Sequence, residues 1–531
     1  VGSEMCIRDR RVARTAAVGG RIVNARVTAP THTDAATLGV RRRIAILATC
    51  CLSLFIVGID TTGLNVALPS IASDLGASGS QLQWVIDAYT LVLASLLLLG
   101  GSMGDRFGRR RVFLTGLTVF ALGSVLCSLA VSPAMLIGAR MLQAVGGSML
   151  NPVAMAIVTN TFTNPTERAR AIGMWGAAFG LSMALGPVIG GALVHSFGWA
   201  SIFWLNVPVC AVAIVLTLTL VPESRAERPR RPDPGAQLLI LVFLATLTFA
   251  IIEGHGLGWS SAVVVGSFIV AAVSFTGLVI LESRRTEPMI DLRFFGSAPF
   301  SSSVLTAILA FAAIGGFLLL NTLYLQQVRG LSPLEAGLMT LPMAGAMALL
   351  APVSGWLVGS RGARMPMVLA GVAIVGAGLM LMRVRVDTSF EYLAVAYLLL
   401  GVGSGLVNAP ITNAAVSGMP RAQAGVASGI ASVSRQVGTS LGVAIFGAVA
   451  FREVGDQADL AAAARPAWLI MALCGLAIIV VGIAATGRWA ASTLDRTRER
   501  ILATETARPC APKPEPRGTV TRIAHTTSAR A

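Results

Sequence analysis

The chain has 531 residues, of which 55% are hydrophobic and 12% are charged, whereas a typical soluble protein carries about 25% charged residues. These values exclude an ordinary soluble enzyme, because several soluble domains of this total length would lack the charges to coat them. The net charge of +16 admits nucleic acid, an acidic partner or the loops of a membrane protein, and its distribution along the chain decides between them.

The N-terminal residues 1–43 are polar and rich in arginine, and we expect them to form a cytoplasmic tail. The first ten residues resemble a translation or sequencing scar. No apolar run with a small-residue cleavage site precedes residue 44, so a removable signal peptide is not expected. The seven cysteines lack the spacing of a metal or redox motif and most lie in apolar runs, so we predict neither disulfides nor a metal site.

Fourteen segments are apolar and long enough to cross a bilayer as helices, which takes about 20 residues each. Arginines that flank these spans number 23 on one side of the membrane and 5 on the other. The positive-inside rule places the richer side, and with it both termini, in the cytoplasm. Membrane topology thus explains the net charge, and no nucleic-acid partner is expected. The predicted spans are roughly 44–68, 82–103, 112–131, 134–156, 170–194, 200–221, 236–253, 261–281, 302–324, 335–358, 366–383, 392–414, 426–450 and 467–487.

The chain also contains an internal repeat. Segment 101–110 (GSMGDRFGRR) is echoed by 355–364 (GWLVGSRGAR), and three further echoes follow in the same order at offsets of 252–257 residues. Helices 1–6 therefore correspond to helices 9–14, with helices 7 and 8 inserted between them. The predicted fold is an all-α polytopic membrane protein of two parallel six-helix halves, an architecture of transporters with a substrate path between the halves. The expected units are the N-terminal half 44–221, a linker 222–301 with the two inserted helices, the C-terminal half 302–487 and a disordered cytoplasmic tail 488–531.

Four charged residues lie well inside predicted spans, away from the span ends, where each costs about 2.5–3.5 kcal/mol at the helix centre and is a functional candidate for that reason. Asp60, Asp87 and Arg140 fall at similar depth in the outer part of the first half. An arginine at that depth favours a charged carboxylate and apolar burial favours a neutral one, so a change in water access would load and release a proton. We predict that Asp60 carries the proton with Arg140 as its partner, the alternative being a static pair that fixes helix packing. Asp87 joins proton coupling, meets a cationic substrate or belongs to a static pair that fixes helix packing. Arg435 is left open between a substrate-cavity residue and a structural one.

Two further segments are candidates for a role in opening and closing the transport path. The loop between helices 2 and 3 combines glycines that allow a tight turn with charged residues that can form ion pairs between the two halves. This combination predicts a latch that closes the cytoplasmic side. The alternative is a basic loop that only sets the membrane topology. Helix 5 contains a proline and several glycines that permit a kink and tight packing. The predicted gate residues are Gly101, Asp105, Arg106, Gly108, Arg109 and Arg110, and the predicted kink residues are Gly180, Gly186, Pro187, Gly190 and Gly191.

These segments resemble the major facilitator superfamily and its fourteen-helix drug:proton antiporter branch. The loop at 101–111 resembles the family signature, and the helix 1, 4, 5 and 6 motifs of the branch are similar to 59–69 (IDTTGLNVALP), 136–143 (LIGARMLQ), 186–191 (GPVIGG) and 198–208 (GWASIFWLNVP). The chain departs from the pattern at Ala144, at Ala200 and at Gly359, which stands opposite Asp105 and leaves latch chemistry to the first half.

The resemblance implies a proton-coupled antiporter, not an enzyme, that exports drug-like, hydrophobic or cationic molecules across a bacterial cytoplasmic membrane. Such a protein uses no cofactor besides the proton as coupling ion. Its expected partners are the substrate and membrane lipid, with a periplasmic adaptor only if the host has an outer membrane. The alternatives are a dedicated exporter of one metabolite or self-made antibiotic and, as a different class, a non-transporting membrane receptor or scaffold. The expected cavity wall comprises Asn65, Trp84, Tyr89, Gln143, Asn321, Tyr324 and Arg435.

Overall fold

The computed structural model describes residues 39–226, 233–285, 288, 290–417, 424–450 and 460–506. Within them, 14 helical spans are long and apolar enough to cross a membrane, which confirms the predicted number. The helices are α2 (Val40–Leu75), α3 (Gly79–Phe107), α4 (Arg109–Ser128), α5 (Pro133–Thr161), α6 (Pro165–Phe197), α7 (Ser201–Leu220), α8 (Pro234–Leu257), α9 (Ala262–Arg284), η3 (Leu292–Gly296), α10 (Ala298–Leu323), η4 (Tyr324–Val328), α11 (Pro333–Met339), α12 (Leu341–Arg361), α13 (Arg364–Leu381), α14 (Phe390–Val416), α15 (Ala424–Ala450), α16 (Leu460–Ala463), α17 (Arg465–Ala484) and α18 (Arg488–Thr506).

The turn between α2 and α3 shows how local sequence sets the helix ends. Gly76 ends α2 with a φ of 63°, a left-handed conformation that favours glycine. Ser78 then begins α3 with a capping box, in which its hydroxyl accepts from the Gln81 amide and the Gln81 side chain accepts from the Ser78 amide. This short turn makes α2 and α3 antiparallel and brings their charged residues to similar depth.

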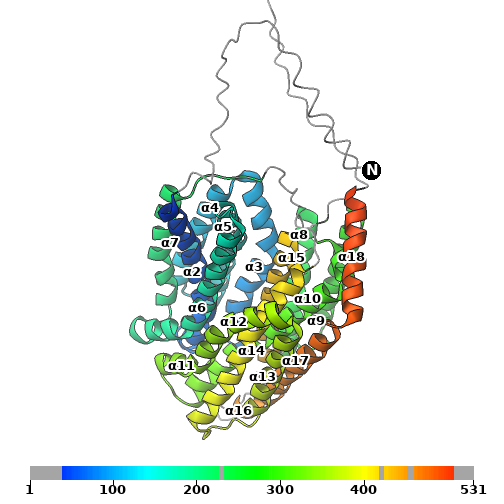
Figure 1. The fold of residues 1–531 in the computed structure, drawn as a ribbon. Coiled ribbons are helices and arrows are strands. Elements are labelled where there is room, and N and C mark those ends of the chain that lie inside the picture. Colours follow the sequence, from blue (N-terminus) through cyan, green and yellow to red (C-terminus); the bar gives the residue numbers. More distant parts are fainter. Residues whose placement is uncertain are drawn as a thin grey trace, which may run out of the picture.

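The two halves repeat the same packing pattern (Figure 1). In the first half, α2 packs on α6, α3 and α4 pack on α5, and α4 packs on α7. In the second half, α10 packs on α15, α12 and α13 pack on α14, and α13 packs on α17. Each pairing in one half has its counterpart in the other, so the internal repeat seen in the sequence is a repeat of structure.

The halves are joined at the outer side of the membrane. The Gln326 side chain, just after α10, donates to the Val66 carbonyl of α2 at 2.8 Å. Beside it, α6 meets α11 so closely that a Cβ added at Gly191 would lie 3.0 Å from the Leu334 Cα. These contacts connect the outer ends of the first and second halves.

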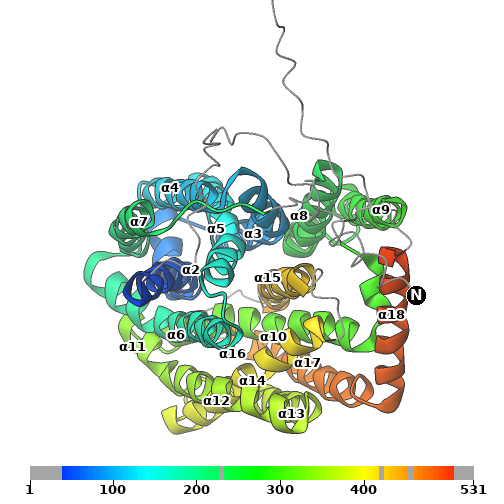
Figure 2. The same cartoon turned by 45° about the horizontal axis from the view of Figure 1, so that its top comes forward.

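The inserted hairpin of α8 and α9 lies beside the junction of the two halves, with α8 packed on both α3 and α15 (Figure 2). Its hydrogen bonds reach α3: Trp84 donates from Nε1 to Glu253 at 2.9 Å, and the Gln237 side chain donates to the Ser95 carbonyl. On the α15 side the contact includes apolar residues such as Val437. The hairpin is therefore bonded to the first half and packed against the second.

The prediction of a disordered tail over 488–531 is wrong for Arg488–Thr506, which form the helix α18. Residues 507–531 lie outside the described part of the chain. This helix packs on η3 and on the start of α10. Ile501 is buried, and the Thr493 hydroxyl accepts a hydrogen bond from the Ala298 amide at 3.0 Å. Because α18 is polar on its other face, a search for long apolar runs does not detect it.

Candidate functional site

A buried carboxylate, Asp60 on α2, is the centre of a hydrogen-bonded group in the first half. Its side chain is 0% exposed and accepts from Arg140 Nη1 at 2.5 Å, from Gln143 Nε2 at 2.9 Å and from Asn206 Nδ2 at 2.9 Å. The Ser124 hydroxyl accepts from both amides, at 2.8 Å from Gln143 and 3.3 Å from Asn206. These five residues are called the Asp60 network below.

The guanidinium of Arg140 extends the network to α3. Its Nε donates to the Val85 carbonyl at 3.3 Å, and its Cζ lies 4.1 Å from the centroid of the Tyr89 ring and 5.7 Å from that of the Phe203 ring. Through Arg140 and the other members of the Asp60 network, α2, α3, α4, α5 and α7 are connected. Removing one partner of a buried pair typically costs 3–5 kcal/mol, because the other charge is left uncompensated. A change in the charge of Asp60 therefore changes the forces on five helices at once.

The structure places the predicted coupling pair, Asp60 and Arg140, in direct contact. Gln143, expected in the cavity wall, instead bonds Asp60, and Tyr89 stacks on Arg140. Asn206 was not given a role by the sequence, because a neutral polar side chain inside an apolar span costs less than a charge and is a weaker signal. Ser124 carried no such signal, because serine hydroxyls often bond to their own helix.

Two other predicted residues, Asp87 and Arg435, lie on the facing helices α3 and α15 and take no part in the Asp60 network. The Asp87 carboxylate is fully buried, is close to Thr90 and to Ser440 of α15, and leaves Oδ2 without a hydrogen bond among the described residues. Arg435 donates from Nη2 to Ser432 at 3.0 Å, and its buried Nη1 has no partner there. Each is a charge without a counter-ion in the described part of the chain.

Three residues expected in the cavity wall have different surroundings. Asn65 donates to the Thr61 carbonyl of its own helix at 3.1 Å and leaves its buried Oδ1 without a described partner. Trp84 faces α8, as described above. Tyr324 donates to the Arg385 carbonyl at 2.7 Å, which fixes its phenol at the outer end of the second half.

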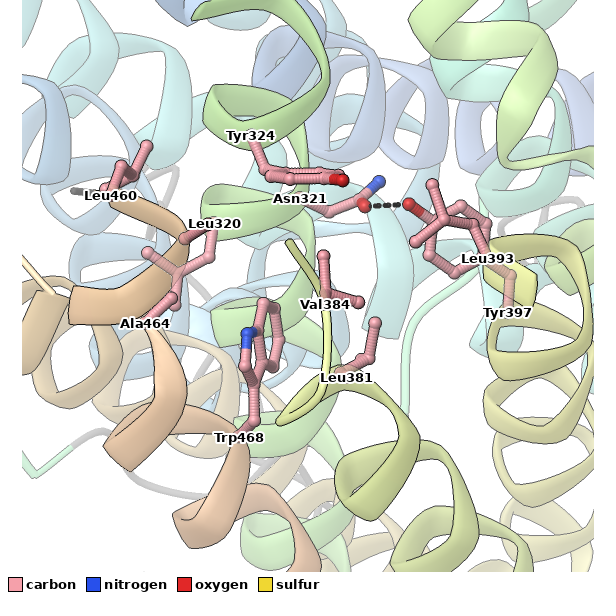
Figure 3. A pocket seen from close by; sticks show the side chains of 11 residues that line it. Leu320, Asn321, Tyr324, Leu381, Val384, Leu393, Tyr397, Leu460, Ala464 and Trp468 are labelled. Carbon is pink, nitrogen blue, oxygen red and sulfur yellow. Dashed lines mark hydrogen bonds between the residues drawn. The ribbon is translucent and has the colours of Figure 1, made fainter. Parts of the chain in front are cut away.

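Asn321 and Tyr324 line a pocket within the second half, between α10, α13, α14, α16 and α17 (Figure 3). Tyr397 donates from its hydroxyl to Asn321, and Trp468 and Leu381 lie on the side of the pocket toward α13 and α17. All of the helices around it belong to one half. These two predicted cavity residues therefore share a site with each other but not with Asp60.

The predicted kink segment of α6 forms two close helix crossings. Toward α2, a Cβ added at Gly63 would lie 3.0 Å from the Gly186 carbonyl oxygen, and one at Gly190 would lie 2.8 Å from the Gly63 Cα. Toward the second half, Gly191 contacts α11 as described above. Gly180 is different, since a Cβ there meets nothing within 4 Å. Pro187 stands inside the same helix, with its carbonyl beside Gly337 of α11, so the segment joins both halves.

The predicted gate loop is bonded to the first half and the segment after α7. Asp105 pairs with Arg109 at 2.9 Å, while Glu223 accepts from the Arg110 amide at 3.1 Å. Gly108 has a φ of 111°, which ends α3 and lets the chain turn into α4. The hydrogen bonds of these charges in the described residues stay on the first-half side, so a latch across the halves remains a prediction.

The remaining gate residues, Gly101 and Arg106, contact α5 and the neighbouring ring of Phe107. Gly101 approaches α5, where its Cβ would lie 3.3 Å from the Pro152 Cβ, and Arg106 lies over the Phe107 ring at 5.6 Å.

Two six-helix halves with buried charges between long apolar helices define a multi-pass membrane transporter. The sequence profile described as Major Facilitator Superfamily matches residues 50–443, and the chain belongs to this family of transport proteins.

Known relatives support the same assignment. The chain is 39% identical over 409 residues to the "Multidrug resistance protein Stp" of Mycobacterium tuberculosis (strain CDC 1551 / Oshkosh), covering 77% of this chain and 76% of the relative. It is 37% identical over 428 residues to the "Tetracenomycin C resistance and export protein" of Streptomyces glaucescens, covering 80% and 79%. Relatives of this kind place the chain in the drug-efflux branch of the family. A solved POT family transporter is 16% identical with a TM-score of 0.62, covers 83% of this chain and 96% of its own, and shows the shared fold.

Proposed function

We propose that this protein exports drug-like, hydrophobic or cationic small molecules across the bacterial cytoplasmic membrane in exchange for protons. The observation that carries the proposal is the Asp60 network, in which one buried carboxylate of α2 accepts hydrogen bonds from α5 and α7, while its partners reach α3 and α4. Relatives named for multidrug resistance and for export support the direction and the class of substrate.

In this mechanism a proton on Asp60 removes the negative charge with which Arg140 is paired. The guanidinium then keeps the Val85 carbonyl, the Gln143 amide oxygen and the aromatic rings, but no carboxylate. The helices of the first half lose their common electrostatic centre, and rearranging them changes the contact of α6 with α11. Release of the proton on the cytoplasmic side restores the network and resets the cycle.

Proton coupling supplies enough energy for export. A charge moved through 100 mV gains about 2.3 kcal/mol, and a factor of ten in concentration corresponds to about 1.4 kcal/mol. One or two protons therefore sustain a substrate gradient of roughly ten- to thousandfold.

A dedicated exporter of a self-made antibiotic is the second candidate, and the relative named for tetracenomycin C export favours it. A panel of substrates separates the two: a multidrug exporter responds to several unrelated compounds, and a dedicated one responds to a single chemical class.

The test uses inverted membrane vesicles with a pH-sensitive dye, to which lipophilic cations and neutral antibiotics are added. Wild-type protein should give substrate-evoked proton movement, and Asp60→Asn should abolish it. Asp74→Asn, which changes an exposed carboxylate near the end of the same helix, is the matched control and should behave as wild type. Proton movement that persists in Asp60→Asn would refute Asp60 as the carrier, and a protein silent toward every compound would favour a receptor.

A further inference from the structure

Arg435 is a cation without a counter-ion inside a membrane span. It lies on α15 within the span Val426–Ala450. None of the ion pairs in the described residues includes it, and one of its two terminal nitrogens is buried with no partner there. A charge at such a position is costly unless it is paired, so a permanent structural role leaves its position unexplained.

The position of Arg435 on α15 is fixed by the neighbours of that helix. One face packs on α10, where a Cβ at Gly438 would lie 2.9 Å from the Ile308 Cα. Ser440, on a different face, lies beside Asp87 of α3. Arg435 precedes Ser440 by five residues, which is about 7–8 Å toward the cytoplasm along the helix. The Arg435 side chain as a whole is partly exposed, while its Nη1 is buried in this conformation, so a ligand would reach Nη1 only after a movement of the neighbouring helices.

The neighbouring helices α3 and α15 therefore carry an acid from one half and a base from the other. Asp87 leaves a carboxylate oxygen free, and Arg435 leaves an amine of its guanidinium free. They form no ion pair with each other, since the salt bridges in the described residues include neither. Two opposite and separately uncompensated charges match a molecule that carries both a cationic and an acidic group.

We propose that Arg435 binds an acidic group of the substrate and that Asp87 meets its cationic group, so that amphoteric molecules are a preferred substrate class. This inference rests on the proposed export function and specifies its substrates. The bond from Nη2 to Ser432 orients the guanidinium and leaves Nη1 to donate. A carboxylate is the group that a guanidinium binds with two parallel hydrogen bonds, which gives it an advantage over a neutral ester at the same place.

The test compares two dyes with the same aromatic body. Rhodamine B is a zwitterion with a free carboxylate at neutral pH, and its ethyl ester is a cation without one. Equilibrium binding of both dyes to the purified full-length protein is measured by fluorescence polarisation for wild type, Arg435→Gln, Arg435→Lys and Arg361→Gln. The last variant removes an exposed arginine at the cytoplasmic end of α12 and serves as the control.

We expect Arg435→Gln to weaken rhodamine B binding at least tenfold and to leave ester binding unchanged or tighter. Arg435→Lys keeps the charge but not the paired hydrogen bonds, so it should weaken rhodamine B binding less than Arg435→Gln does. Equal losses for both dyes, or no loss for rhodamine B, would overturn the inference. Should Arg435→Gln fail to fold, competition on wild type decides: benzoate should displace rhodamine B and not the ester, and displacement of both or of neither would refute the acidic subsite. Binding is read without a proton gradient, so failure of proton coupling is a separate result.

Discussion

The pairing of Asp60 with Arg140 predicts strong energetic coupling between two residues 80 positions apart. The pair is 2.5 Å apart with side chains 0% and 1% exposed. Asp60→Asn leaves a buried guanidinium without its carboxylate, and Arg140→Gln leaves a buried carboxylate without its cation. Each single change should lower the free energy of unfolding by about 3–5 kcal/mol. The double variant, in which both groups are neutral amides, should lose less than the sum by at least about 2 kcal/mol.

The assay is unfolding by SDS titration in mixed micelles at one pH, with helical circular dichroism as the signal. The control is a second cycle on Arg43 and Glu167, which pair at 2.7 Å on the cytoplasmic side with side chains 22% and 46% exposed. Exposed pairs contribute about 0–1 kcal/mol, so this cycle should show little coupling. Additive losses at Asp60 and Arg140 would refute the idea that their charges depend on each other.

Three further predictions follow from other contacts. Asp87→Asn removes a buried charge that lacks a counter-ion, so the protein should be as stable as wild type or more stable. Proton movement evoked by cationic substrates should nevertheless fall at least tenfold. Unchanged proton movement would contradict a role for this residue. Gly190→Val should stop transport in vesicles, because its Cβ would lie 2.8 Å from the Gly63 Cα, whereas Gly180→Ala should transport normally. Trp84→Phe removes a hydrogen bond to Glu253 worth about 1.5–3 kcal/mol. It should speed amide hydrogen exchange in α8 but not in α13. An exchange rate in α8 equal to that of wild type would show that this bond does not anchor the hairpin.

The spans were predictable because each helix must bury about 20 apolar residues in lipid, and that run is visible in the sequence. The pairing of Asp60 and Arg140 was predictable because counting residues from the helix ends gives depth. The depth of a residue in the membrane does not say which side of its helix the side chain lies on. The sequence therefore could not show that Asp87, at a depth similar to that of Asp60, faces α15 and not Arg140. Direction becomes known only when helices far apart in the sequence are packed together.

Other parts of the site could not be read from the sequence for related reasons. Asn206 is neutral, so it lacks the cost that marks an intramembrane charge, yet it donates to Asp60 from α7. Trp84 is half-buried in a span and is compatible with a cavity wall, and only the position of α8 shows that it bonds Glu253. The amphipathic helix α18 has no long apolar run, so hydropathy alone assigns its residues to a tail.

The central claim, export coupled to protons through Asp60, is tested most directly by measuring substrate flux and proton flux in the same proteoliposomes. With a substrate gradient as the only driving force, wild type should move protons opposite to the substrate, and the two fluxes should keep a constant ratio as the gradient is varied. Asp60→Asn should still bind substrate but give no proton flux. Substrate movement without proton movement in wild type, or an unchanged flux ratio in Asp60→Asn, would contradict the account.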